Sequence, residues 1–260
     1  MTAPPVRFSR LIVDLGSGAP DRATLRYVAE FAKLLKIDLL GLWARDQRLA
    51  GLAGLPVLRE FRTLERRWLA VPGANLARDL ERAAEFAQRA LDEAGVSAGV
   101  TCHFEFAQAP AAEAITAAAG ATDIIVAAPA RALHDRALQP FPDFLAAALA
   151  TPAAVLIVPD RVVRSRGPIL TIAETPEDPL LLASAAAIAL AANERSEVVT
   201  ASSLALPPPI GLPDSIRERL IVMSRSADAS VALATAAHRS VPVLVLRPAT
   251  TADTDDERRR

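Results

Sequence analysis

The chain has 260 residues, of which 52% are apolar and 23% charged, an ordinary composition for a globular protein with a sizeable core. Its 29 basic and 30 acidic residues give a net charge of −1, so no overall field favours nucleic acid or an anionic membrane. The lone Cys102 excludes an internal disulfide framework, and the first residues lack the layout of an export signal. We therefore expect a cytoplasmic protein with neither a nucleic-acid nor a membrane partner.

The first half of the chain alternates predicted strands with predicted helices. A helical period starts at Asp21, with apolar residues every three or four positions up to Leu35. Further helices are predicted over 74–94, with Gly95 as a stop, and over 110–119. Short apolar runs predict strands at 11–15, 39–44, 100–106, 123–127 and 154–158. This alternation indicates a parallel sheet with helices on both faces.

The second half repeats the pattern in shorter form. Helices are predicted over 179–192 and near 228–238, and strands at 169–173, 198–202, 220–224 and 243–246. Compared with the first half, one helix and one strand are missing, and the proline-rich stretch Leu206 to Pro213 bridges the gap. We predict a duplicated α/β unit with domains at 1–162 and 163–249, followed by a disordered tail at 250–260.

Several stretches carry a resemblance to a known family. Gln108-Ala109-Pro110-Ala111-Ala112-Glu113-Ala114-Ile115 precedes Asp123-Ile124-Ile125-Val126, and Thr151-Pro152-Ala153-Ala154-Val155-Leu156-Ile157-Val158 follows. This succession resembles the third helix, fourth strand and closing strand of the universal stress protein (UspA-like) family, here as a tandem member. The resemblance implies two Rossmann-like, adenine nucleotide alpha hydrolase-like units, with a five-stranded parallel sheet in the first half and a shortened sheet in the second. In the nucleotide-binding branch, it also implies ATP beside the first and fourth strands.

The nucleotide signature of that branch is degenerate in this chain. The family's aspartate after the first strand aligns with Gly16, and Asp14 lies two residues earlier. The family's phosphate loop requires glycines, whose backbone NH groups can approach phosphate oxygens closely. The aligned positions hold Ala128, Arg131, Phe141 and Pro142. Pro142 has no NH to donate, so the resemblance predicts a lost ATP site.

A second phosphate-binding pattern is incomplete. Gly16-Ser17-Gly18 follows a strand and precedes a helix, as in dinucleotide-binding turns, but Asp21 stands where the third glycine belongs. A carboxylate there repels phosphate and suits a helix N-cap, so we interpret the stretch as a tight turn. Any ligand in the first-half crevice would contact the following candidates: Asp14, Gly16, Ser17, Gly18, Ala128 and Arg131.

No motif for catalysis or metal binding stands out. The chain has no Gly-x-Ser-x-Gly elbow and no zinc-spaced His/Cys cluster. Cys102 and His103 are neighbours on a predicted strand, so their side chains should point to opposite faces and could not share a metal ion. We expect neither an enzyme nor a cofactor.

An extra segment, Leu52 to Trp68, combines leucines and aromatic residues with four arginines. Its amphipathic pattern predicts a helix that packs on its own sheet. A subunit interface or an anionic membrane surface is the alternative for its apolar face.

The sequence therefore predicts a non-catalytic, universal stress protein-like scaffold. We expect its two halves to pair through 155–158 and 243–246, because an exposed apolar edge strand invites aggregation. A further homodimer or an unknown protein partner is compatible with this. The alternative is a sensor that holds ATP or AMP with Gly16, Ser17, Gly18 and Arg131, and a small-molecule enzyme on the same fold is a third option.

Overall fold

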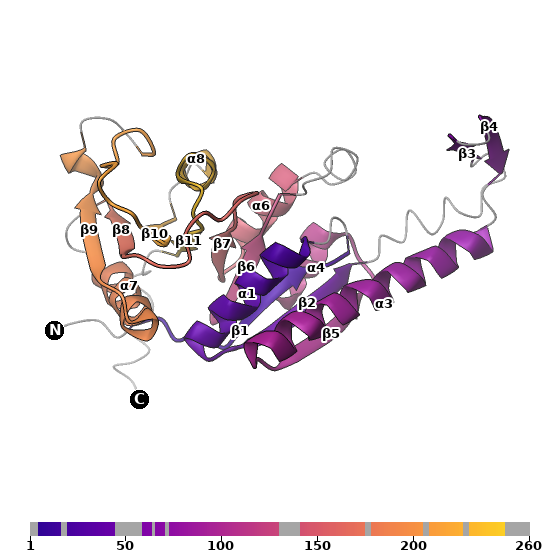
Figure 1. The fold of residues 1–260 in the computed structure, drawn as a ribbon, viewed down its shortest axis with the longest axis horizontal. Coiled ribbons are helices and arrows are strands. Elements are labelled where there is room, and N and C mark those ends of the chain that lie inside the picture. Colours follow the sequence, from indigo (N-terminus) through magenta and orange to yellow (C-terminus); the bar gives the residue numbers. More distant parts are fainter. Residues whose placement is uncertain are drawn as a thin grey trace.

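The computed structural model describes residues 5–16, 20–44, 59–63, 66–70, 73–129, 141–174, 178–204, 208–225 and 229–247. Within these ranges, one large sheet runs through both halves of the chain (Figure 1). Its nine strands are β1 Arg10–Asp14, β2 Asp38–Ala44, β5 Cys102–Ala107, β6 Asp123–Ala127, β7 Ala154–Ile157, β8 Ile169–Ala173, β9 Ser196–Thr200, β10 Leu220–Ser224 and β11 Val243–Leu246. The α/β architecture expected from the alternating pattern is confirmed.

The strand order across the sheet is β5-β2-β1-β6-β7-β11-β10-β8-β9. All neighbours pair in parallel except β7 and β11, which are antiparallel, with Leu156 opposite Leu244 and Val155 opposite Val245. We call this β7–β11 pair the seam. The seam confirms the prediction that 155–158 and 243–246 meet. Because β7 and β11 pair with each other, neither apolar strand is left as an exposed edge of the sheet.

The two sides of the seam share a strand order. The first half runs β5-β2-β1-β6-β7 and the second β9-β8-β10-β11, so the second lacks a counterpart of the edge strand β5. Between β9 and β10, the described residues form only a short 3-10 turn, Ala201–Ser203, where the first half has two helices. The prediction of one missing helix is therefore wrong: two are missing. The boundaries at 162 and 249 stay predictions, and the tail at 250–260 lies outside the described residues.

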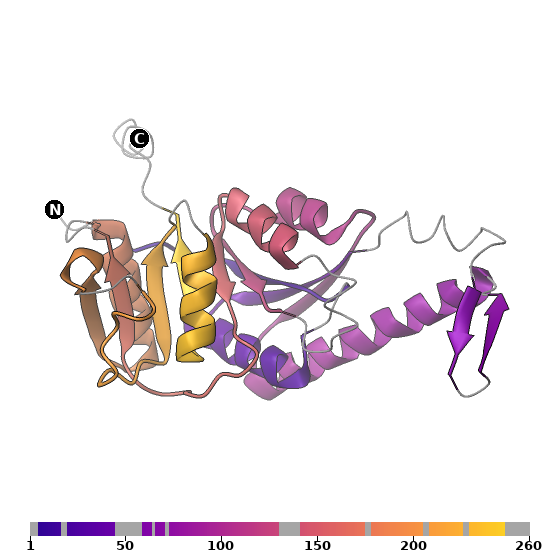
Figure 2. The ribbon, with the colours of Figure 1, turned by 90° about the horizontal axis from the view of Figure 1, so that it is seen from above.

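Helices cover both faces of the sheet (Figure 2). On one face lie α1 Arg22–Leu35, α3 Gly73–Ala98 and α7 Pro179–Ala192, and on the other α4 Ala111–Ala118, α6 Phe141–Ala150 and α8 Ala229–Arg239. Alternate residues of each strand point to the two faces, so Leu11 and Val13 join one core and Ile12 the other. The seam therefore lies between two continuous apolar layers.

Capping residues set the ends of the helices that flank the seam. The Asp21 Oδ1 accepts a hydrogen bond of 2.8 Å from the Thr24 backbone NH, which confirms Asp21 as the N-cap of α1. Asp178 caps α7 in the same way, accepting from the Leu181 NH at 3.0 Å. Asn193 ends α7 in the left-handed region at φ 54°. These local signals explain why helix ends near the seam agree with the sequence pattern.

The C-terminus of α3 differs from the sequence expectation. The helix does not stop at Gly95 but continues to Ala98, and Gly99 with φ +74° follows it. A Cβ atom at Gly95 would overlap the Cys102 Sγ. Gly95 is thus required by the close approach of α3 to β5. In the sequence, this glycine has the same appearance as a glycine that ends a helix.

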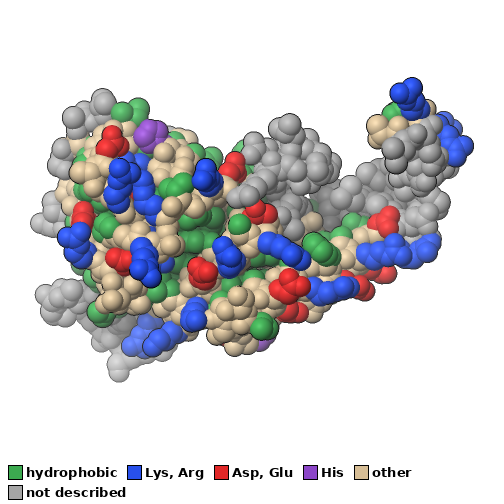
Figure 3. Space-filling model, viewed as in Figure 1, with side chains coloured by type: hydrophobic (Ala, Val, Ile, Leu, Met, Phe, Trp, Pro, Cys, Tyr) green, Lys and Arg blue, Asp and Glu red, His purple; other side chains and the backbone are tan. Residues whose placement is uncertain are grey.

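The extra segment before α3 forms a hairpin where it is described. Strands β3 Arg59–Arg62 and β4 Arg67–Ala70 pair antiparallel at the far end of α3, away from the large sheet (Figures 1 and 3). The rings of Phe61 and Trp68 contact each other across the strands, with centroids 5.3 Å apart and planes tilted by 57°. The prediction of a helix packed on the sheet is wrong for this part of the chain. The described residues form a hairpin instead, in which the two aromatic side chains pair across the strands. Residues 52–58 lie outside the described ones.

This hairpin makes the two tryptophans distinguishable. Trp68 is 62% exposed, whereas Trp43 in β2 is 6% exposed. Trp68→Phe is therefore expected to remove the iodide-quenchable, red-shifted part of the tryptophan emission and leave a blue-shifted, protected signal. Steady-state quenching measures this, with Trp43→Phe as the matched control that retains the quenchable part. Equal quenching of the two variants would contradict the exposed hairpin.

None of the helices formed by the described residues is long and apolar enough to cross a membrane.

Candidate functional site

The sequence placed its candidate ligand contacts at the carboxyl ends of β1 and β6, the position that we call the first-half crevice. These two strands are direct neighbours, with Val13 opposite Val126. Of the six candidates, Asp14, Gly16 and Ala128 lie in the described part, and Ser17, Gly18 and Arg131 lie outside it. Open parallel sheets bind ligands at the carboxyl ends of their strands, so a ligand here would need side chains and NH groups that are not already bonded within the chain.

Asp14 and Gly16 are held within the turn that follows β1. The Asp14 carboxylate is buried, and its Oδ1 accepts a 3.0 Å hydrogen bond from the Gly16 NH. A Cβ atom on Gly16 would lie 2.6 Å from the Ala44 carbonyl oxygen. The glycine is therefore required because the β2 end approaches this turn closely.

The far side of the first-half crevice lacks a phosphate cradle in its described residues. Ala128, which follows β6, packs with its methyl group against the core on the α1 face. Helix α6 begins at Phe141, so Pro142 occupies its first turn. Proline is well accommodated there because the first helical NH groups have no intrahelical acceptor, but it removes a donor that a phosphate would need.

We call the corresponding position in the second half, at the carboxyl ends of β8 and β10, the second-half crevice, and its described polar groups Ser224 and Asp178 bind each other. The Ser224 hydroxyl donates a 2.6 Å hydrogen bond to Oδ2 of Asp178. The other carboxylate oxygen of Asp178 caps α7. A negative carboxylate thus sits at the helix N-terminus, where an anionic ligand would otherwise bind. Sequence reasoning missed Asp178, because its partner Ser224 is 46 residues away along the chain.

Arg225, the residue after β10, extends from this crevice across the seam. Its Nη1 and Nη2 donate hydrogen bonds of 2.8 and 2.6 Å to the Thr151 and Ala153 carbonyl oxygens, just before β7. Burial, and then the nearby Arg247, lower the pKa of its guanidinium. Arg225 follows β10 as Ala128 follows β6, so a position that is a candidate ligand contact in one half is a structural tie in the other.

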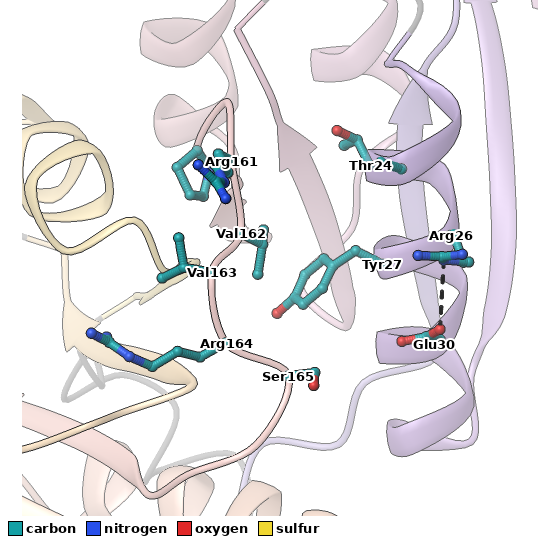
Figure 4. Close-up of a pocket in the computed structure, with 11 residues that line it drawn as sticks. Thr24, Arg26, Tyr27, Glu30, Arg161, Val162, Val163, Arg164 and Ser165 are labelled. Atoms are coloured by element: carbon teal, nitrogen blue, oxygen red, sulfur yellow. Dashed lines mark ion pairs between the residues drawn. The ribbon is translucent and has the colours of Figure 1, made fainter.

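A pocket of about 290 Å³ lies between α1 and the segment that connects β7 to β8. We call it the junction pocket (Figure 4). The Tyr27 side chain extends from α1 toward the connecting segment, and its ring stacks on Phe31 with a centroid distance of 6.2 Å. The sequence analysis missed this pocket, because the connection carries no recognisable motif. Its lining residues are Ala23, Thr24, Arg26, Tyr27, Glu30, Pro159, Arg161, Val162, Val163, Arg164 and Ser165.

Comparison with known proteins identifies the fold. A universal stress protein from Archaeoglobus fulgidus superposes with a TM-score of 0.55 at 14% identity, covering 91% of this chain and 96% of that chain. The fold is similar to that of a universal stress protein. A candidate universal stress protein from Pseudomonas aeruginosa has a TM-score of 0.47 and 15% identity, covering 93% and 94% of the two chains. A protein of unknown function from the same species has values of 0.46 and 14%, covering 93% of both chains.

Sequence comparisons are negative: no family model and no curated protein matches the chain. The similarity to the universal stress protein therefore rests on the arrangement of strands and helices. It confirms the Rossmann-like fold that the sequence resemblance implied. It does not extend to the ligand contacts, which have to be judged on the residues of this chain.

Cys102 and His103 do not form a site in this universal stress protein-like fold. Burial raises the pKa of the Cys102 thiol, whose Sγ lies 3.7 Å from the Leu91 carbonyl oxygen against α3. His103 is exposed on the opposite face, with its Nε2 3.8 Å from Oδ2 of Asp38. The prediction that the two side chains diverge is confirmed. Among the described residues, no group of three or more His, Cys, Asp or Glu side chains could hold a metal ion.

The Arg225 tie leads to a stability prediction. Arg225→Ala is expected to lower the free energy of unfolding by about 1–3 kcal/mol, because two buried carbonyl oxygens lose a charged donor. Urea denaturation followed by circular dichroism measures the change. Arg247→Ala is the matched control, since Arg247 is exposed and close to Arg225, and it should have little effect. Equal midpoints for Arg225→Ala and the unmodified chain would refute the tie.

Proposed function

We propose that the chain is a non-catalytic scaffold of the universal stress protein fold. Its two halves pair as two separate subunits would, and neither crevice binds ATP. The observation that carries this proposal is the second-half crevice, where Ser224 and Asp178 bind each other at 2.6 Å and Arg225 extends to the first half. The described polar groups of this crevice are therefore engaged within the chain.

The first-half crevice supports the same conclusion. Asp14 accepts a hydrogen bond from its own turn, Gly16 is required by the Ala44 backbone, and Pro142 has no NH to offer. A scaffold whose crevices hold no nucleotide acts through its surfaces, so we propose a protein partner or a second copy of the chain as its target. A cytoplasmic stress-response role belongs to the same proposal.

The alternative is an adenine-nucleotide sensor that uses the first-half crevice. Calorimetric titration of the full chain with ATP and with AMP separates the two functions. The scaffold predicts no saturable heat up to millimolar nucleotide. Saturable micromolar binding that Gly18→Asp abolishes would overturn the scaffold and establish the sensor.

Two controls make this titration specific. Binding that survives Gly18→Asp but disappears in Arg161→Gln would come from the junction pocket, because Arg161 lines that pocket. Incubation with ATP and detection of released phosphate tests the enzyme option on the same samples. Turnover that scales with protein and persists through repeated purification would contradict a non-catalytic scaffold.

A further inference from the structure

We propose that the junction pocket binds a small organic oxyanion, a phosphomonoester or a carboxylate, with an apolar body. The pocket is lined by three arginines, Arg26, Arg161 and Arg164, against a single acidic residue, Glu30. The excess of positive charge favours a negatively charged ligand. The pocket shares no residue with the crevice candidates, so this proposal does not depend on the fate of the ATP site.

The three arginines differ in availability. The Arg26 Nε lies 4.0 Å from Oε1 of Glu30, and the Arg164 Nη1 lies 3.8 Å from the buried Glu218 Oε1. Arg161 is exposed and forms no ion pair with the described residues. Its guanidinium can therefore turn to a ligand without losing an existing partner, and guanidinium groups pair bidentately with carboxylates and phosphates.

Tyr27 supplies a hydrogen-bond donor from the other wall. Its hydroxyl points from α1 into the gap toward the connecting segment (Figure 4), and it has no hydrogen-bond partner among the described residues. Tyr27 is half-buried, so its hydroxyl is open to a partner that enters the pocket. Burial raises the pKa of Tyr27, so its hydroxyl stays protonated and can donate to an oxyanion.

Size and apolar lining define the rest of the ligand. A volume of about 290 Å³ accommodates on the order of ten non-hydrogen atoms, given about 30 Å³ per water in the liquid. Pro159, Val162 and Val163 add apolar surface to the connecting-segment wall. A free inorganic ion would leave this surface uncovered, whereas an aromatic or aliphatic body would bury it.

Calorimetry or ligand-observed NMR on the full chain tests this, with phenyl phosphate and benzoate as probes. We expect saturable binding of at least one probe at a sub-millimolar dissociation constant, and weaker binding of inorganic phosphate and of neutral benzyl alcohol. If phenyl phosphate binds more tightly than benzoate, the ligand is a phosphomonoester; if benzoate binds more tightly, it is a carboxylate.

Variants localise the binding. Arg161→Gln should weaken it about tenfold or more, as loss of a charged hydrogen bond does. Tyr27→Phe should weaken it severalfold while the ring still stacks on Phe31. Arg166→Gln is the matched control, because Arg166 is exposed on the same connection but does not line the pocket, and it should bind normally. Circular dichroism confirms that each variant folds. No saturable binding of either probe, or equal dissociation constants for Arg161→Gln and Arg166→Gln, would overturn the proposal.

Discussion

Leu244→Ala is expected to lower the free energy of unfolding by about 2–5 kcal/mol, the range for removing most of a leucine side chain from a core. Leu244 is fully buried at the seam and lies directly opposite Leu156, which is equally buried. The two leucines belong to the apolar layer between the sheet and helices α1 and α7. A cavity there would therefore weaken the contact between the halves.

The tryptophans make the coupling of the halves measurable. Trp43 lies in β2, in the first half, whereas Leu244 lies in β11 of the second. In a Trp68→Phe background, Leu244→Ala should shift the urea midpoint of the Trp43 fluorescence together with that of circular dichroism, because the sheet is continuous. If Leu244→Ala left the urea midpoint of Trp43 fluorescence unchanged while ellipticity was lost at lower urea, the two halves would unfold separately.

Two further variants complete this experiment. Leu156→Ala should have an effect of similar size, and the double variant should lose less than the sum, because both side chains border one cavity. Leu190→Ala on α7 is the matched control, since Leu190 is 83% exposed, and it should leave the midpoint nearly unchanged. Strict additivity of the two seam variants would argue against a shared contact.

Arg239→Ala is expected to lower the free energy of unfolding by about 3 kcal/mol, because it leaves a fully buried carboxylate without its main partner. The Arg239 Nε and Nη2 donate bidentate hydrogen bonds of 2.8 and 2.9 Å to Glu218, and Nη2 also donates to the Ile216 carbonyl oxygen at 3.0 Å. These bonds hold the segment before β10 on α8. Arg164, 3.8 Å from the same carboxylate, would compensate only part of the lost charge.

Controls separate the buried pair from general surface charge. Asp214→Ala removes a fully exposed partner of Arg239 and should have little effect, since exposed ion pairs contribute little. Glu218→Gln in the Arg239→Ala background should recover part of the loss, because a neutral amide costs less to bury than a charge. Thermal and urea unfolding measure these changes. An Arg239→Ala variant as stable as Asp214→Ala would contradict a structural role for the pair.

Local sequence signals predicted much of the fold because they act over a few residues. Asp21 precedes a helix and accepts the NH three positions later, so the start of α1 could be inferred from residue type. Apolar runs such as 123–127 and 243–246 fit strands buried on both faces. The prediction of secondary structure failed where one sequence pattern fits both a helix and a hairpin. The aromatic spacing of Phe61 and Trp68 suits a helix face and equally a cross-strand pair.

The candidate site could be predicted only in part. Sequence alone placed β1 beside β6 and showed the missing phosphate-binding glycines, since these depend on strand order and on position along one loop. It did not find the pairing of Ser224 with Asp178 or the extension of Arg225 to Thr151, 74 residues away. Nor did it find the junction pocket, whose walls come from α1 and a connection that follows it by more than a hundred residues.

Residue order by itself determined the alternation of strands and helices, the shortened second half and the absence of a glycine-rich phosphate loop. Only the tertiary structure decided that Gly16 and Gly95 are glycines because other backbone or side-chain atoms approach them, and that Arg225 joins the halves. The physical reason is the distance along the chain over which each kind of interaction acts. Propensities, caps and periodicity depend on neighbours along the chain, whereas close packing, buried ion pairs and pockets depend on segments that become neighbours only when the sheet assembles.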